Sequence, residues 1–166
     1  MKNKVLLALL VVILAVFVLG AVAVNNKTTE GYLRIHIRAN SNSEADQNIK
    51  YEVKEKVSEF LEGAVSGCQS ASEAMKIVSA NLGSISSISR GVLRQRGFNY
   101  GARAKLVEEY FPTRSYDSLV LENGLYDALI IELGAGEGDN WWCVVYPPLC
   151  FKKSGSDQII KSIFKK

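Results

Sequence analysis

The chain has 166 residues, of which 20 are Lys or Arg and 17 are Asp or Glu, so its formal net charge is +3. This length favours one compact domain with terminal additions. The small charge excess excludes a nucleic-acid-binding role, because that role needs a strongly basic surface.

The first residues form an export or anchor segment. Lys2 and Lys4 precede an uncharged apolar run, and Ala21-Val22-Ala23 has the small-x-small form of a signal-peptidase site. The run of about 20 residues is also long enough to span a bilayer. We expect residues 1–23 to be a cleaved signal peptide or a membrane anchor, and the rest to be exported. Without them 18 basic residues face 17 acidic ones, a net charge near +1.

Residues 24–31 read as a polar linker that leads into a first strand. Residues 33–38 alternate apolar and polar side chains, which is typical of a half-buried strand. We place the lone His36 on the solvated face of this strand.

Helical spacing of apolar side chains predicts three helices after this strand. The first follows a capping box at Ser41 or Ser43 and ends at Gly63 or Gly67. The second begins at Ser70 and stops at Gly83, and the third stops at Gly97.

From residue 98 onward the side chains alternate with a period of two residues, which indicates strands. Strand patterns cover residues 98–110, 125–133 and 140–146. We interpret the connection "GAGEGDN" (134–140) as a hairpin turn, because its acidic residues would repel phosphate. The elements predict an α+β two-layer sandwich, with an antiparallel sheet of about four strands packed on about three helices. The domain covers residues 32–151, and 152–166 form a tail.

The three cysteines, Cys68, Cys143 and Cys150, point to a disulfide rather than to a metal. Cys143 and Cys150 flank a Pro-Pro turn that can fold the chain back. An exported domain can keep disulfides, so we predict this pair, with Cys68 buried and free. One histidine and three scattered thiols cannot assemble a zinc site, and we expect no metal and no cofactor.

The residues argue against catalysis. A cysteine nucleophile needs a nearby base, and His36 is the only histidine. Cys143 lies inside a strand pattern, where thiols are usually buried and inert. Glu108 and Glu109 point to opposite faces of a strand and cannot converge. We expect no enzyme activity and no small-molecule substrate.

The stretch "NWWCVVYPPLCF" (140–151) favours a contact surface. Strand alternation puts one of Trp141 and Trp142 inward and the other outward. Trp and Tyr are frequent anchors of protein interfaces. We expect the outward ring to be extended by an apolar rim of Tyr146, Pro147, Pro148 and Phe151. Two alternatives stay open: both rings are covered internally, or the outward ring stacks on a glycan.

Two segments resemble the stage II sporulation protein R family. "IRANSNSEADQNIKYEVKEKV" (37–57) resembles its A-N-S-x-S-x-x-D-Q-x-x-K segment. Residues 110–151 resemble its closing block, with F-P-T-x-x-Y, a Gly-rich turn and N-W-W-C-V-x-x-P-P-L-C-F. Asn42 stands where the family frequently has Asp.

The resemblance implies an exported signalling protein of endospore-forming bacteria that is not itself an enzyme. The forespore would release it into the space between forespore and mother-cell membranes. There it would activate a membrane-embedded aspartic peptidase, which processes the precursor of the sporulation sigma-E factor. If the tryptophan stretch is core, the turn with Asn40 and Ser41 is the next contact candidate. A wall-glycan-binding or thiol-dependent exported protein is the alternative.

Overall fold

The computed structural model describes residues 31–116, 119–149 and 151. The predicted signal or anchor segment, most of the linker and the tail lie outside these residues. Within them, no helix is long and apolar enough to cross a membrane. The elements in chain order are β1 (Leu33–Arg38), α2 (Glu44–Val65), α3 (Ala71–Ala80), α4 (Leu82–Gln95), β2 (Ala102–Phe111), β3 (Arg114–Tyr116), β4 (Leu119–Leu121), β5 (Gly124–Leu133) and β6 (Asn140–Tyr146).

Capping residues determine where the first two helices begin. The Ser43 hydroxyl accepts a hydrogen bond from the backbone N–H of Asp46, and the Ser70 hydroxyl accepts one from that of Glu73. Such bonds satisfy N–H groups that have no partner inside the helix. Of the two caps predicted for the first helix, Ser41 and Ser43, the structure has Ser43, and the predicted start at Ser70 is confirmed. α4 follows α3 directly, with Asn81 as their shared boundary.

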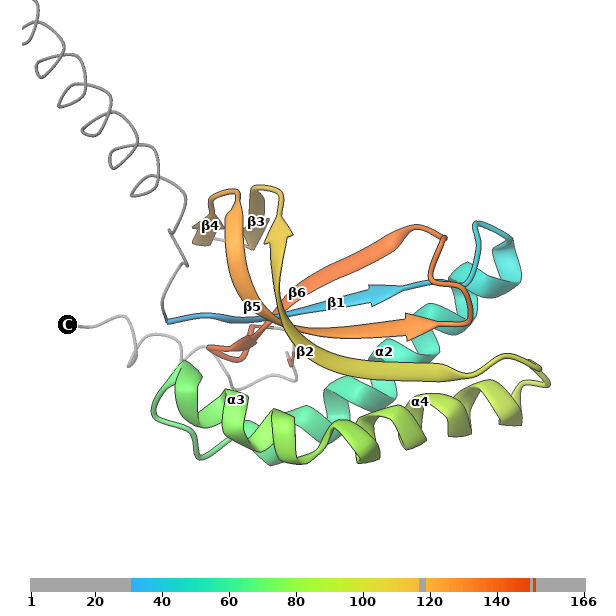
Figure 1. Cartoon of the computed structure of the whole chain (residues 1–166), viewed down its shortest axis with the longest axis horizontal. Helices are drawn as coiled ribbons and strands as arrows, with labels where there is room; N and C mark the ends of the chain where they lie inside the picture. The colour runs from blue at the N-terminus through green and yellow to red at the C-terminus, as the bar shows by residue number, and fades with distance from the viewer. Residues whose placement is uncertain (1–30, 117–118, 150, 152–166) are drawn as a thin grey trace, which may run out of the picture.

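The predicted α+β class is confirmed, with three helices on one face of a four-stranded sheet (Figure 1). The strand order is β2-β5-β1-β6, and β3 pairs only with β4 in a separate two-stranded sheet. β1 runs parallel to β5 and antiparallel to β6. The sheet is therefore mixed. The prediction of an antiparallel sheet is wrong for the pair β1–β5, which is parallel.

The prediction of a hairpin at residues 134–140 is also wrong. β5 and β6 do not pair with each other, because β1 lies between them. After the three helices the chain forms β2 at the edge of the sheet and not beside β1. The two neighbours of β1 are therefore the later strands β5 and β6. The glycine-rich segment is a connection that passes over the end of β1.

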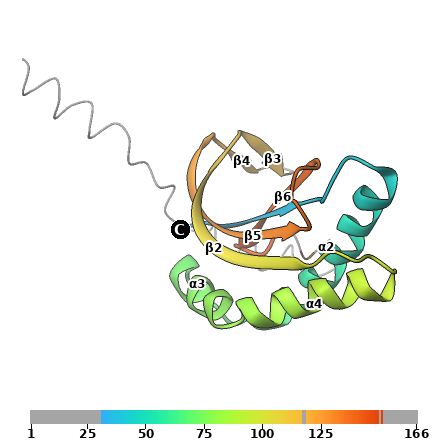
Figure 2. The same ribbon diagram turned by 45° about the vertical axis from the view of Figure 1, so that its right-hand side comes forward.

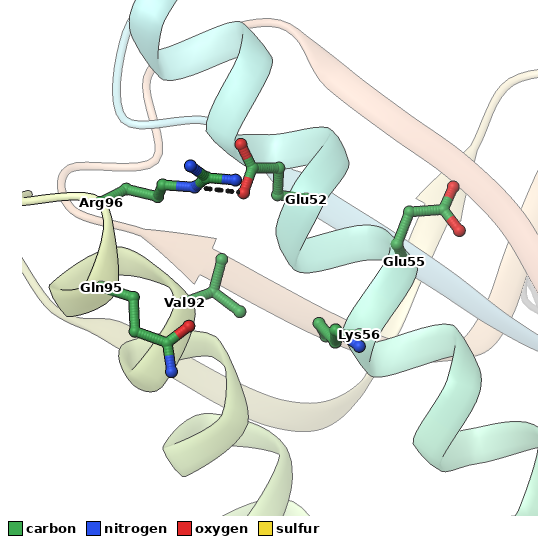
Figure 3. Close-up of a pocket in the computed structure, with 6 residues that line it drawn as sticks. All are labelled: Glu52, Glu55, Lys56, Val92, Gln95 and Arg96. Atoms are coloured by element: carbon green, nitrogen blue, oxygen red, sulfur yellow. Dashed lines mark hydrogen bonds and ion pairs between the residues drawn. The ribbon is translucent and has the colours of Figure 1, made fainter.

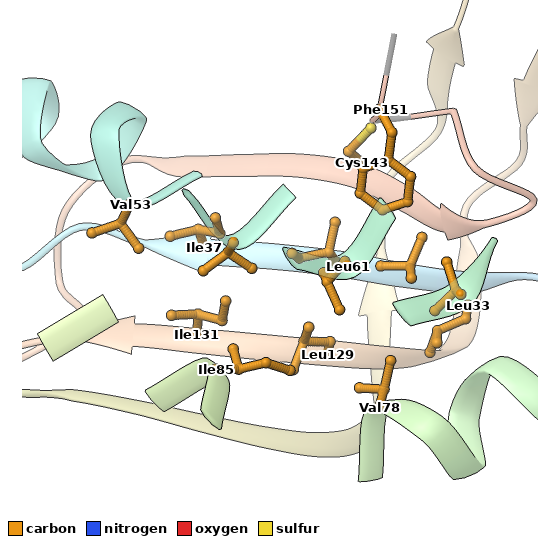
Figure 4. Close-up of a cluster of buried hydrophobic side chains, with 14 of the residues drawn as sticks. Leu33, Ile37, Val53, Leu61, Val78, Ile85, Leu129, Ile131, Cys143 and Phe151 are labelled. Carbon is orange, nitrogen blue, oxygen red and sulfur yellow. The ribbon is translucent and has the colours of Figure 1, made fainter. Parts of the chain in front are cut away.

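The main core lies between the helices and one face of the sheet (Figure 4). Alternate residues of the central strands, such as Ile37 and Ile131, meet helical residues such as Leu61 and Ile85. All four side chains have no exposed surface. Burial of this apolar area is the main force that holds the helical layer on the sheet.

The face turned away from the helices, called the second face here, is partly covered by the protein's own strands. In the register of the sheet, His36 and Lys105 both pair with Ile130, from opposite sides. The His36 side chain nevertheless contacts Glu109 and Phe111, which lie further along β2. The β2–β5 ribbon therefore curls back over the sheet, as Figure 2 shows, next to the β3–β4 hairpin.

A smaller apolar cluster fills the space under this curl. Phe111 and Tyr126 have no exposed surface, and their rings meet edge to face. The other buried members are Leu121, Ala128, Ile130 and Val144. This second cluster explains why the polar side chains of β1 are also buried: Arg34 is 0% exposed and His36 is 2% exposed. The prediction of a solvated His36 is wrong.

Candidate functional site

A chain of charged side chains crosses the second face. Glu109 lies 3.0 Å from the Nδ1 of His36 and also pairs with Arg38. Arg38 pairs in turn with Glu132, which accepts a further hydrogen bond from Lys105. This bond, with the nearby positive charges, holds the pKa of Glu132 below its usual value although burial opposes it. The charged chain ties β1, β2 and β5 together where the ribbon curls over.

Trp142 lies on the second face, and Trp141 lies on the helical face. Trp142 stacks on His36, with ring centroids 3.7 Å apart, and meets Phe111 edge to face at 4.8 Å. Trp141 packs against the main core, and the Lys54 ammonium lies 5.7 Å from its ring centroid. Both rings are half-buried. The predicted placement on opposite faces is confirmed, with Trp142 next to the charged chain.

The expected apolar rim around the outward ring is not formed as predicted. Tyr146 is 6% exposed and Phe151 is 5% exposed, and both belong to the main core. A register shift in the pairing of β6 with β1 lets Val145 and Tyr146 both pack on the helical side. Pro147 is buried and Pro148 is half-buried. Of the aromatic residues in this stretch, Trp142 is therefore the one that packs on the second face.

Asn40 and Ser41 belong to a polar junction between the β1–α2 loop and the β5–β6 connection. The buried Asp46 carboxylate accepts hydrogen bonds from the Asn40 amide at 2.8 Å, the Ser41 hydroxyl at 2.6 Å and the Tyr100 hydroxyl. Burial raises the pKa of Asp46, but the hydrogen bonds outweigh it and leave the pKa below its usual value. The pKa of Tyr100 is raised by burial and by this carboxylate.

Backbone bonds complete the polar junction. The Asn40 side-chain oxygen accepts from the N–H of Ala135 at 2.9 Å, and that of Asn42 accepts from the N–H of Asp139 at 2.6 Å. The Gly138 N–H donates to the Ala39 carbonyl at 2.8 Å. An Asp at position 42 could accept the same bond as Asn42. The A-N-S-x-S-x-x-D segment therefore has a structural role inside the domain, because its polar side chains bond to one another and to the β5–β6 connection. This role explains the spacing of the motif.

Comparisons with known proteins match the sequence to one family. The family model for stage II sporulation protein R matches residues 29–156. A curated stage II sporulation protein R from Bacillus subtilis (strain 168) is 33% identical over 129 residues, which cover 78% of this chain. The chain belongs to the stage II sporulation protein R family. The aligned part spans 58% of the length of the curated relative. No solved structure gives a significant match.

Among the described cysteines, Cys68 is a free thiol that its surroundings do not activate. Cys68 is free, 9% exposed, and burial together with the charge of Glu73 raises its pKa, so little thiolate forms at neutral pH. The prediction of a buried, free Cys68 is confirmed. Cys143 is 7% exposed in the main core, and Cys150 lies outside the described residues. Across those residues, no group of three or more His, Cys, Asp or Glu could hold a metal.

The disulfide between Cys143 and Cys150 stays a prediction of the sequence. We expect the intact mass to increase on reduction by the mass of two hydrogen atoms, which corresponds to one disulfide. Closing so short a loop is worth roughly 2–3 kcal/mol in the chain-entropy model. Alkylation of all three cysteines in the native, unreduced protein would contradict the pairing.

A groove of about 600 Å³ lies between α2 and α4 on the helical layer (Figure 3). The Arg96 Nε and the Glu52 carboxylate face each other across it at 2.7 Å. The remaining lining residues are Glu55, Lys56, Val92 and Gln95. The lining residues are half-buried or exposed, and Arg96 and Glu52 already pair with each other, so we propose no ligand for this groove.

The titration of His36 gives a testable prediction for the second face. Burial lowers the pKa of His36, although its hydrogen bond to Glu109 acts in the opposite direction. The folded state therefore binds this proton more weakly than the unfolded state, whose pKa is 6.5. Stability should be complete above that value and decrease as the pH falls from about 7.5 to 5.5.

Urea unfolding across this pH range measures the effect. His36 is the only histidine of the chain. The His36→Gln variant should therefore lose most of the dependence of stability on pH, even if the variant is less stable than the wild type. An equal slope in the variant would contradict the assignment.

Proposed function

We propose that this chain is an exported intercellular signal of sporulation that activates a membrane-embedded aspartic peptidase and so leads to processing of pro-sigma-E. Membership of the stage II sporulation protein R family carries the proposal, since the match includes both motif segments. The signal would act in the space between forespore and mother cell, released from residues 1–23 or held by them. A ligand that binds the active state of the peptidase more tightly shifts the enzyme toward that state.

The geometry supports a binding role for the second face. It presents the half-buried Trp142 ring, stacked on His36, beside the charged chain that runs from Glu109 to Lys105. Aromatic rings that are fixed by their neighbours lose little conformational entropy on binding. The buried Cys68 thiol gives the thiol-enzyme alternative little support.

Reconstitution tests the proposal directly. The purified chain is added to membranes that contain the peptidase and pro-sigma-E, and cleavage is followed with time. We expect cleavage that needs the folded chain and an intact peptidase. Membranes whose peptidase lacks its catalytic aspartate are the matched control. Cleavage that is independent of the added chain, or no cleavage at all, would overturn the proposal.

Replacing Trp142 with alanine should weaken peptidase activation more than it weakens the fold. Loss of an interface anchor typically costs about 2 kcal/mol or more of binding free energy. Loss of the ring contacts with His36 and Phe111 costs about 1–2 kcal/mol of stability, so activation is compared at equal amounts of folded chain. The measurements are the concentration of chain needed for half-maximal cleavage and the urea midpoint.

Trp141→Ala is the matched control, because its ring packs on the main core. It should destabilise the domain by about 2–3 kcal/mol and leave activation by the folded fraction unchanged. Equal activation by the Trp142→Ala and wild-type chains would place the docking surface elsewhere.

A further inference from the structure

Arg34 is a buried cation that forms no ion pair with any carboxylate of the described residues. The side chain is 0% exposed, and within the described part of the chain it donates one hydrogen bond, from Nη2 to the Tyr116 hydroxyl at 2.8 Å. Its Nε and Nη1 are buried and have no partner. An arginine keeps its charge in proteins, and buried charges are normally paired. Such an uncompensated group is unusual in a structural core.

Aromatic rings surround this cation but leave donors open. The guanidinium carbon lies 4.1 Å from the Phe111 ring centroid, 4.7 Å from that of Tyr126 and 5.9 Å from that of Tyr116. The ring faces attract a positive charge and offset part of its lost hydration. They do not replace the oxygen acceptors that a guanidinium normally has. The cage therefore holds the cation in place with N–H groups still available.

The hydrogen-bond partner of Arg34 is itself partly exposed. The Tyr116 side chain is half-buried and belongs to β3. The β3–β4 pair forms its own two-stranded sheet, separate from the four-stranded one. Displacing the Tyr116 ring therefore breaks no strand pairing of the main sheet. Arg114, two residues earlier on the same strand, is exposed and adds positive charge to this region.

We propose that Arg34 is a binding site for a carboxylate group, which replaces the Tyr116 hydroxyl as its hydrogen-bond partner. A carboxylate accepts several N–H bonds at once and brings the missing negative charge. A small organic acid or an acidic side chain of a partner protein could supply this chemistry. The second source rests on the proposed function, in which the partner is the peptidase.

Acetate is the probe for the site itself. The full chain, in mild detergent, is unfolded with urea in sodium acetate and in sodium chloride at equal ionic strength and pH. A ligand that binds only the folded state raises its stability. The wild-type midpoint should rise in acetate and saturate with concentration. Arg34→Met should lose this response, and in chloride its midpoint should not fall below that of the wild type.

Arg103→Met is the matched control, because Arg103 is an exposed arginine of β2. It should respond to acetate as the wild type does. An equal midpoint for the wild type in both salts, or an equal response in Arg34→Met, would overturn the proposal. If Arg34→Met does not fold, Tyr116→Phe replaces it, since it removes the present acceptor with little change in shape. Its response to acetate should exceed that of the wild type, and a smaller response would also overturn the site.

The cleavage reconstitution distinguishes the two sources. If folded Arg34→Met fails to activate the peptidase, an acidic side chain of the partner supplies the carboxylate. If it activates normally while the wild type still responds to acetate, the ligand is a free acid. If the wild-type chain itself does not activate the peptidase, the proposed function fails, and the acetate response still decides whether the site exists.

Discussion

Replacing Asp46 with alanine should lower the free energy of unfolding by about 4 kcal/mol. The carboxylate is 5% exposed and is the shared acceptor for Asn40, Ser41 and Tyr100. Without it these half-buried donors have fewer acceptors in the polar junction, and the loop that begins α2 loses its anchor. Urea unfolding near neutral pH measures the loss.

Two further variants define the cause. Asp46→Asn keeps the size of the side chain but not its charge, so it should lose part of this stability. Glu44→Ala removes an exposed acid from the same first turn and should cost less than about 1 kcal/mol. Because the folded pKa of Asp46 is lowered, its contribution should decrease as the pH falls through that pKa. Equal stability of Asp46→Ala and Glu44→Ala would contradict the role of the junction.

Gly138→Ala should destabilise the domain by about 3 kcal/mol or more. A Cβ at this position would lie 2.2 Å from the Ser41 carbonyl oxygen and 2.5 Å from its carbon. These are backbone atoms that cannot rotate away, so the two loops would have to separate. The Gly138 N–H bond to the Ala39 carbonyl would weaken with them. Thermal or urea unfolding measures the effect.

Gly136→Ala is the matched control in the same connection. Gly136 has φ +68°, but the nearest atom to its added Cβ is 3.6 Å away. Only the left-handed backbone penalty of about 1–2 kcal/mol should apply. If Gly138→Ala loses no more stability than Gly136→Ala, the close approach of the two loops is not a constraint.

Local patterns in the sequence predicted the three helices but not all of their ends. Serine caps predicted the start at Ser70, and a start at Ser41 or Ser43 of which the structure has Ser43. The predicted stop at Gly83 is wrong, because Gly83 lies inside α4. Strand pairing is not local, so the central position of β1 could not be read from residues 33–38 alone. Alternation suggested that Arg34 and His36 face water. They are buried instead because Phe111 and Glu109 curl over them from β2.

The candidate site was predicted in part. Alternation correctly placed Trp141 and Trp142 on opposite faces, because it depends only on neighbouring residues. Alternation failed for Tyr146. The register shift between β1 and β6 puts its side chain on the helical face, together with that of Val145. Sequence reasoning missed Arg34 as a functional candidate. Its aromatic neighbours, Phe111, Tyr116 and Tyr126, are far away in the chain, and no spacing rule connects them to it.

The central position of β1 also affects the order of folding. β1 is made first, yet it pairs with β5 and β6, the last strands of the domain. The sheet cannot close before most of the chain is available, and such non-local pairing slows folding. Incomplete chains expose the edges of β1 and the apolar helix faces. If the protein is exported, this delay keeps the chain unfolded during its passage across the membrane, and the domain forms on the far side.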